Sequence, residues 1–205
     1  TYTWERPIST QQTGFSHIAQ CRRGLPDPVG GCLWYGVDDT DTTVWFPLYA
    51  GITDLPPSFT RGSLEEFSWD SGWWVFNLVA NYAGLKYSYM IEDIRAAQRE
   101  LEGGLIAMQP AVEATAARLH AQDPALCARY LTTYSVGEAE RVAARWQTLA
   151  GALIAKYNDG YVIENGRERE VGYPQAWRDA VLKLRPEQFR LPRAAADSLA
   201  TALPY

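Results

Sequence analysis

Residues 30–50 read "GGCLWYGVDDTDTTVWFPLYA" and contain two runs of aromatic and β-branched residues separated by a short polar stretch. Runs of this composition, bounded by turn-forming residues, are typical of β-strands. The polar stretch "DDTDT" at 38–42 is short enough to join them as a hairpin. A third run, "FSHIAQCR" at 15–22, precedes them across "GLPDPV". We therefore predict an antiparallel meander over 15–22, 30–37 and 43–50.

The last of these strands is apolar on both sides. Successive side chains of a strand alternate between faces, so Trp45 and Tyr49 share one face while Phe46 and Leu48 share the other. Apolar residues on both faces predict a sheet that is covered on both sides. Pro47 lacks an N–H for the ladder, and we therefore expect it at a sheet edge or a bulge.

The sequence becomes helical near residue 70. The stretch "DSGWWVFNLVANYAG" at 70–84 offers Asp70 or Ser71 as an N-cap and Gly84 as a C-terminal stop. It is apolar on nearly every side between these residues, which predicts a buried helix.

The remaining residues continue the helical pattern with several expected breaks. Gly103-Gly104 and Pro110 are predicted interruptions, and Asp123-Pro124 is a predicted helix start. The motif "SVGE" at 135–138 has the form of a capping box. An apolar stripe follows it: Val142, Trp146, Leu149, Leu153 and Tyr157. We predict an α+β fold, with a strand-rich segment over 1–69 and a helical segment over 70–205.

Charge and hydropathy exclude several partners. The net charge of −5 and the pI near 5.1 argue against nucleic acid, because binding a polyanion needs clustered Lys and Arg. No apolar run approaches the roughly 20 residues needed to span a bilayer. We therefore expect no membrane partner and a cytoplasmic protein.

The cysteines and histidines do not form a recognisable site. Cys21, Cys32 and Cys127 are an odd number at unrelated spacings, and the two histidines, His17 and His120, lie far apart. We predict buried or inert thiols, no metal and no cofactor. On one strand His17 and Cys21 would lie about 13 Å apart, too far for a catalytic pair. Thr1, with its own α-amine as base, is a separate candidate nucleophile.

The candidates for substrate binding on the predicted strand and helix are Arg22, Trp73 and Asn77. Asn77 and Asn81 lie on one face of the 70–84 helix, in line with Trp73. A buried amide must be hydrogen-bonded, either to neighbouring backbone or within a site that it orients. Arg22, at the end of the first strand, can bind a substrate carboxylate or pair with an acidic residue of the 38–41 loop.

Several stretches together resemble a known enzyme family. They are "HIAQCRRGLPDPVGGCLWYGVDDTDTTVWFPLYAGITDLPPSF" at 17–59, "DSGWWVFNLVANYAGLKYSYMIEDI" at 70–94, "KYNDGY" at 156–161 and "GYPQAW" at 172–177. In this order they resemble the C-terminal part of the dipeptidase A family of cysteine peptidases, to which the secernins are related. The resemblance extends from about Trp4 to Trp177.

The resemblance implies a fold, an activity and a partner. The family consists of N-terminal-nucleophile hydrolases, in which two antiparallel sheets pack between helical layers, and its members release amino acids from dipeptides. The nucleophile is a cysteine at the mature N-terminus, whose α-amine acts as base, and nothing in this chain matches it. We therefore expect the C-terminal portion of a dipeptidase, without catalytic residues of its own. Its expected partners are the N-terminal portion of the same protein and a dipeptide bound by Arg22, Trp73 and Asn77. Assembly of the protein into a homo-oligomer is a further possibility that the sequence leaves open.

Two alternatives remain. A non-catalytic binding module would contact a sugar or a peptide through aromatic residues, and it requires several of Trp34, Trp45, Tyr49 and Phe59 on one exposed face. A secernin-like scaffold would keep the fold without peptidase activity.

Overall fold

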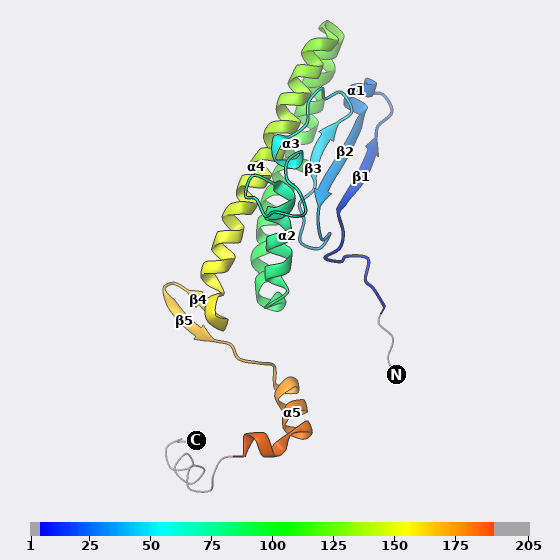
Figure 1. The fold of residues 1–205 in the computed structure, drawn as a ribbon. Helices are drawn as coiled ribbons and strands as arrows, with labels where there is room; N and C mark the ends of the chain where they lie inside the picture. Colours follow the sequence, from blue (N-terminus) through cyan, green and yellow to red (C-terminus); the bar gives the residue numbers. More distant parts are fainter. Residues whose placement is uncertain (1–4, 191–205) are drawn as a thin grey trace. The chain divides into compact units, whose positions relative to one another are not determined.

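The structure, a computed structural model, describes residues 5–190. The chain divides into two compact units, residues 1–158 and 159–205. The first unit holds a sheet and three long helices (Figure 1). The predicted α+β fold is confirmed, with antiparallel strands followed by helices. The change in secondary structure near residue 70 falls inside the first unit, so the strands and their covering helices belong together.

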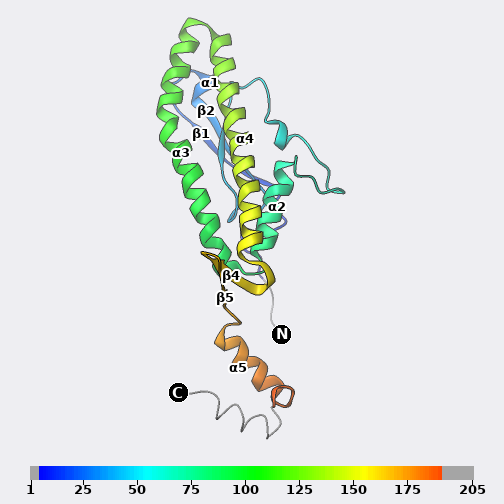
Figure 2. The same cartoon turned by 90° about the vertical axis from the view of Figure 1, so that its left-hand side faces the viewer.

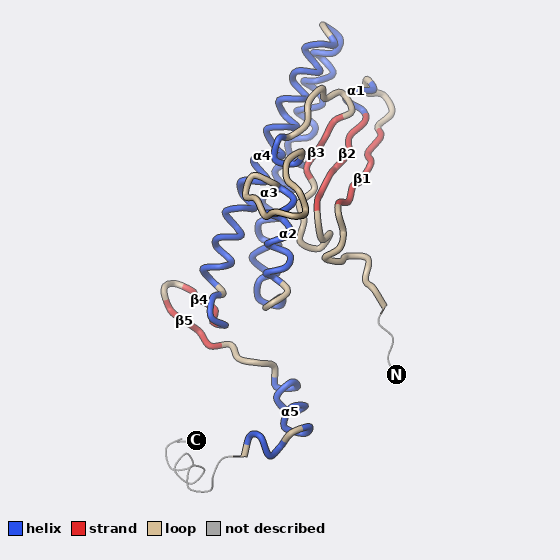
Figure 3. The backbone as a smooth tube through the Cα atoms, viewed as in Figure 1, coloured by secondary structure: helices blue, strands red, loops and turns tan. Residues whose placement is uncertain are grey.

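The sheet is the antiparallel meander predicted from residues 15–50. Its strand order is β1-β2-β3 (Figure 3), and a four-residue helix, α1, connects β1 to β2. Pro47 lies in β3, an edge strand, as predicted for a residue that cannot donate to a ladder. The bounds are β1 Phe15–Cys21, α1 Asp27–Gly30, β2 Gly31–Val37 and β3 Phe46–Tyr49.

The two faces of the sheet have different surroundings. Trp34, Trp45 and Tyr49 share one face, and α3 (Tyr87–Gln122) covers it, since Glu102 accepts a hydrogen bond from the Trp45 N–H and Glu113 accepts one from the Tyr49 hydroxyl. The long helices run beside the sheet (Figures 1 and 2). On the other face, Phe46 is covered by Phe59 at a ring-centroid distance of 4.7 Å, in the short helical turn η1 (Pro57–Phe59). The prediction of two covered faces therefore holds for β3. It is wrong for β1 and β2 among residues 5–190, where Phe15 and Leu33 are exposed.

Helix α2, Gly72–Ala83, begins after Ser71 and ends before Gly84, as predicted. It packs against α4, and the apolar residues Val75, Phe76 and Val79 are buried there. Asn81 is exposed, so the prediction of a helix buried on all sides is wrong. Its main packing partner, α4, buries one face, and residues on the side away from α4 are partly accessible or exposed.

Helices α3, Tyr87–Gln122, and α4, Pro124–Lys156, form a hairpin joined by Asp123 alone (Figure 2). The Asp123 carboxylate accepts a hydrogen bond from the Ala125 N–H at 2.8 Å, which confirms the predicted helix start. The predicted breaks at Gly103-Gly104 and Pro110 are wrong, since α3 continues through them. Packing of α3 on α4 and on the sheet outweighs their low helix propensity.

The motif "SVGE" at 135–138 does not begin a helix. Ser135 lies inside α4, and its hydroxyl accepts a hydrogen bond at 3.4 Å from the Tyr49 N–H of β3. The capping-box prediction is therefore wrong, and α4 instead covers the outer edge of β3. The core between the helices and the sheet contains Val29, Cys32, Tyr49, Val112, Ala116, Cys127 and Leu131. The predicted stripe is buried throughout: Val142, Trp146, Leu149, Leu153 and Tyr157.

The second unit contains a two-stranded antiparallel ribbon and a short amphipathic helix. Its elements follow η2, Asn158–Gly160, and are β4 Tyr161–Glu164, β5 Arg167–Glu170, α5 Gln175–Leu184 and η3 Pro186–Phe189. Among the helices that the structure describes, none combines the length and the apolar character needed to cross a bilayer.

Candidate functional site

Asn77 of α2 is bound to the loop that follows β2. Its amide donates a hydrogen bond to Asp38 Oδ1 at 3.0 Å. The Asn81 amide donates to the Asn77 carbonyl oxygen at 2.8 Å, so Asn81 has the backbone-anchoring role expected for such residues. Asn77 has a side-chain partner instead, and this carboxyl group was not among the residues singled out from the sequence.

Asp38 is a buried and incompletely bonded carboxyl group. Asp38 is 1% exposed, and its Oδ2 atom has no hydrogen-bond partner in the described chain. Burial raises the pKa of Asp38, while the hydrogen bonds from Asn77 and from the Asp39 backbone act in the opposite direction. Asp38 also has φ of 64°, a left-handed conformation in which Asp and Asn are favoured among non-glycine residues. The hydrogen bond thus holds the Asn77 amide beside a group that resists ionisation.

Trp73 lies one helical turn before Asn77 on α2 and is half-buried. Its ring meets that of Trp74 edge to face, with centroids 4.9 Å apart. The Trp74 indole N–H donates to the Ser63 carbonyl oxygen at 2.8 Å, which fixes the second ring. Trp73 and Asn77 are therefore on one side of α2, next to a fixed aromatic neighbour.

Arg22 lies in a network at the far end of β1. Its guanidinium forms an ion pair with Glu113 of α3 and donates to Gln20 Oε1 and the Val29 carbonyl oxygen, each at 3.0 Å. Glu113 also accepts from the Tyr49 hydroxyl at 3.2 Å. The prediction of a structural acidic partner has the right chemistry, but the partner comes from α3 and not from the 38–41 loop.

The structure separates Arg22 from Asn77. Cys21 pairs with Gly31 at one end of the sheet and Phe15 pairs with Val37 at the other, six residue steps away. Six steps span about 20 Å, whereas two extended residues span about 7 Å. Because Arg22 follows Cys21 and Asp38 follows Val37, Arg22 and the Asp38–Asn77 pair lie near opposite ends of the sheet.

A polar pocket of about 310 Å³ borders the proline loop at 56–57. Its lining includes Ser58, Arg61, Asp70 and Glu140, together with the first residue of α2. Glu140 is occupied, since its two oxygens accept from the backbone N–H and the hydroxyl of Ser58. The loop after β3 is therefore the rim of a pocket that carries charges of both signs.

The four aromatic residues named for a binding platform do not share one exposed face. Tyr49 is buried, and Phe59 packs on Phe46 across the sheet. Trp34 and Trp45 are half-buried and line a separate cleft with α3. The geometry required for a flat aromatic platform is therefore not met.

The thiols have the inert surroundings predicted from the sequence in two cases of three. Cys32 and Cys127 are buried, and burial raises the pKa of both, that of Cys32 to about 12. Cys21 is exposed, so its prediction as a buried thiol is wrong; it lies on the open strand β1. Within residues 5–190, no three His, Cys, Asp or Glu side chains gather as metal ligands. Thr1 lies outside the described residues.

Sequence reasoning missed Asp38 and Glu113. Asp38 carried a usable signal, because an acid that directly follows an apolar strand is positioned near the sheet end. Glu113 carried none, because it lies among many charged residues of a helical stretch. Its role depends on which side of α3 meets the sheet.

Comparison with known proteins gives one family. The model of Peptidase family C69 matches residues 1–100, which include the sheet, the proline loop, α2 and the first part of α3. No curated protein matches the chain. The family match supports a peptidase function in general. Over residues 1–100 it agrees with the resemblance to the dipeptidase A family drawn from the sequence motifs, while the motifs at 156–161 and 172–177 lie outside the matched residues.

Proposed function

We propose that this chain is the C-terminal portion of a dipeptide hydrolase whose nucleophilic cysteine belongs to an N-terminal portion of the same protein. The family match over residues 1–100 is the observation that carries the proposal. It covers the loop of Asp38 and the helix of Asn77, which are the two groups joined in the candidate site.

The surroundings of the cysteines support an external nucleophile. A thiol attacks as its thiolate, and the raised pKa values of Cys32 and Cys127 oppose thiolate formation at neutral pH. Cys21 is exposed on β1, and no hydrogen bond from a basic side chain reaches it in the described chain.

The sheet has a surface suited to the proposed N-terminal portion. No described strand pairs with the outer edge of β1, which therefore presents unpaired N–H and C=O groups. Phe15 of β1 and Leu33 of β2 are exposed on the face opposite the helices. A strand added by a second segment would pair with the free edge of β1, and apolar side chains of that segment would bury Phe15 and Leu33.

In the assembled enzyme, the cysteine thiolate would attack the peptide carbonyl and amide donors would stabilise the oxyanion. Asn77 has two amide hydrogens and directs one to Asp38, so the second is available to a substrate oxygen. Trp73, one turn away, would form an apolar wall. Arg22 keeps its place in the Glu113 network and supports the fold instead of holding the same dipeptide.

The test is dipeptide hydrolysis by the 205-residue chain alone and together with the N-terminal portion. We expect no turnover by the chain alone and turnover by the combination. Activity of the isolated chain that is lost in Thr1→Ala would overturn the proposal, because the nucleophile would then be Thr1.

A second measurement tests the residue roles in the combined enzyme. Asn77→Ala should lower kcat/KM by about 100-fold, the effect of removing one oxyanion donor. Asn81→Ala is the matched control, since that exposed amide bonds only to the Asn77 backbone among the contacts described. Equal activity of the two variants would remove Asn77 from the site.

A further inference from the structure

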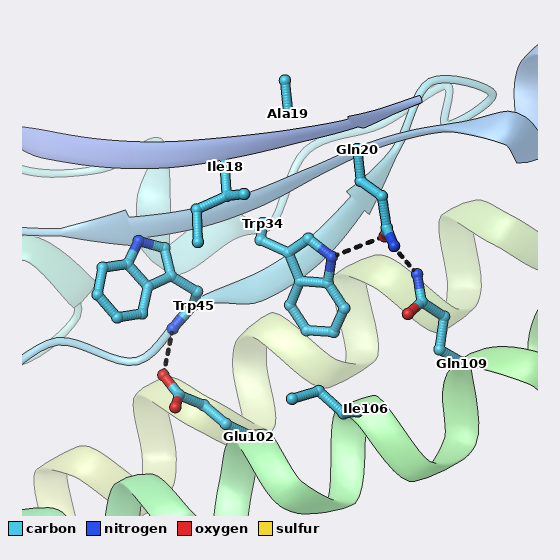
Figure 4. Close-up of a pocket in the computed structure, with 8 residues that line it drawn as sticks. All are labelled: Ile18, Ala19, Gln20, Trp34, Trp45, Glu102, Ile106 and Gln109. Carbon is cyan, nitrogen blue, oxygen red and sulfur yellow. Dashed lines mark hydrogen bonds between the residues drawn. The ribbon is translucent and has the colours of Figure 1, made fainter. Parts of the chain in front are cut away.

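A cleft of about 410 Å³ lies between β1, β2 and α3, apart from the Asp38–Asn77 pair (Figure 4). Its volume is within the range of about 300–1,000 Å³ in which proteins bind small molecules. The sheet contributes Ile18, Trp34 and Trp45, and α3 contributes Glu102, Ile106 and Gln109. The cleft thus lies between the sheet and α3, which belong to the same compact unit.

The two indole rings are fixed in place. The Trp34 Nε1–H donates to Gln20 Oε1 at 3.0 Å, and the Trp45 Nε1–H donates to Ser16 Oγ at 3.0 Å. Because the polar edge of each ring is already bonded to β1, a ligand in the cleft meets the apolar part of the ring. Figure 4 shows Ile18 and Ile106 extending into the same space from opposite sides. These side chains suit the hydrocarbon part of a ligand.

Two side-chain oxygens that line the cleft have no described hydrogen-bond donor, one on Gln109 and one on Glu102. Gln109 donates its amide to Gln20 Oε1 at 2.7 Å, so its own carbonyl oxygen remains available (Figure 4). Glu102 accepts the Trp45 backbone N–H on Oε1 at 3.1 Å, and no described group donates to Oε2. At the Glu102 end of the cleft, the free carboxylate oxygen favours a ligand that donates hydrogen bonds.

Glu102 also has no positive partner. No ion pair joins it to a described Lys, Arg or His, although it is half-buried. Burial raises the pKa of Glu102, and the Trp45 N–H is the one contact that lowers it. A cation placed in the cleft would supply the missing countercharge, and the neighbouring indole faces would add cation–π attraction.

We propose that this cleft binds a small organic ammonium ion with an apolar body. The ammonium group lies at Glu102 Oε2, and the apolar body packs against Trp34 and Ile106. Anions are excluded by the Glu102 charge. This site is independent of the peptidase proposal, since it uses neither Asn77 nor an external cysteine.

The experiment is calorimetric titration of the full chain with phenethylamine and with 2-phenylethanol, its neutral counterpart of similar size. We expect the amine to bind about tenfold more tightly, as a charge-assisted hydrogen bond predicts. Glu102→Gln keeps an acceptor for the Trp45 N–H but removes the charge, and it should abolish this preference. Glu92→Gln removes the same charge elsewhere on α3 and should leave the preference intact.

A second pair of variants keeps the test independent of the folding of Glu102→Gln. Ile106 is 59% exposed and lines the cleft, whereas Met108 is 54% exposed on the same helix and is not part of its lining. Ile106→Lys places a tethered ammonium group in the cleft and should abolish phenethylamine binding, while Met108→Lys should not. Equal affinity for amine and alcohol, no amine binding at about 10 mM, or identical behaviour of the two lysine variants would each overturn the proposal.

Discussion

Arg22 and Glu113 form an ion pair that is largely shielded from water, with side chains 22% and 13% exposed. Replacing Arg22 by Met would leave the Glu113 charge without its partner. We expect Arg22→Met to lower the free energy of unfolding by about 3 kcal/mol, measured by urea denaturation.

The control is Arg145→Met, which breaks the pair between Arg145 and the more exposed Glu100. An exposed pair contributes about 0–1 kcal/mol, so the two variants should differ clearly. Similar losses in both would show that the Arg22 network is not specially stabilising.

Asp38 predicts a pH dependence. Because its pKa is raised in the folded state, the folded protein holds this proton more tightly than the unfolded chain. The associated stability is complete below the ordinary value of 3.8 and is lost as the pH rises through the raised pKa. Asp38→Asn stays uncharged and tolerates the positive φ, so it should gain stability relative to the native protein as the pH rises.

Urea denaturation of both proteins between about pH 4 and pH 8 measures this difference. Asp54→Asn, in the exposed loop after β3, provides the matched control. If the difference in free energy of unfolding between Asp38→Asn and the native protein does not grow as the pH rises, the raised pKa of Asp38 would be contradicted.

At the residue scale, sequence reasoning finds polar groups in apolar surroundings but not their partners. Asn77 and Arg22 stand out because an amide or a guanidinium needs compensation when it is buried. Asp38 is 39 residues from Asn77 along the chain, and the contact exists only once β2 and α2 are packed. Arg22 is suited to a carboxylate, but the sequence does not reveal that Glu113 of α3 supplies one.

At the element scale, the glycines of the long helices allow a direct test. A Cβ at Gly103 or Gly104 would meet no atom within 4 Å, whereas one at Gly51 would lie 2.5 Å from the Pro28 Cβ. Gly103→Ala and Gly104→Ala should each stabilise the protein by about 0.5–1 kcal/mol. Gly51→Ala should destabilise it by about 1–3 kcal/mol. Thermal unfolding checks the sign of each change, and destabilisation at both helical positions would indicate that α3 is broken there.

The same helices show where element prediction succeeds and fails. The strand runs, the cap at Asp123 and the ends of α2 follow from local chemistry, and all three are observed. The breaks at Gly103-Gly104 and Pro110 were predicted from local propensity alone. A glycine or proline inside a helix costs about 1–3 kcal/mol of helix stability. Packing of the 36-residue helix α3 against α4 outweighs this cost.

At the scale of the whole molecule, the first unit should fold without the second. Apart from Val162, the buried hydrophobic residues of the described chain lie between Val29 and Tyr157. We expect a chain that ends at Asn158 to keep its cooperative urea transition, with a midpoint close to that of the 205-residue protein. A truncated chain without cooperative unfolding would show that residues 159–205 are needed for the fold.

The hydrogen bond from Tyr49 to Ser135 joins residues 86 positions apart, and it closes the sheet onto a helix made much later. At about 5–20 residues per second, a ribosome needs about 4–17 s to add the intervening chain. During that interval the aromatic strands have left the site of synthesis but lack the helix that covers them. The apolar residues of β3 are therefore exposed on the nascent chain until α4 has been synthesised. During that time they are a surface to which chaperones bind.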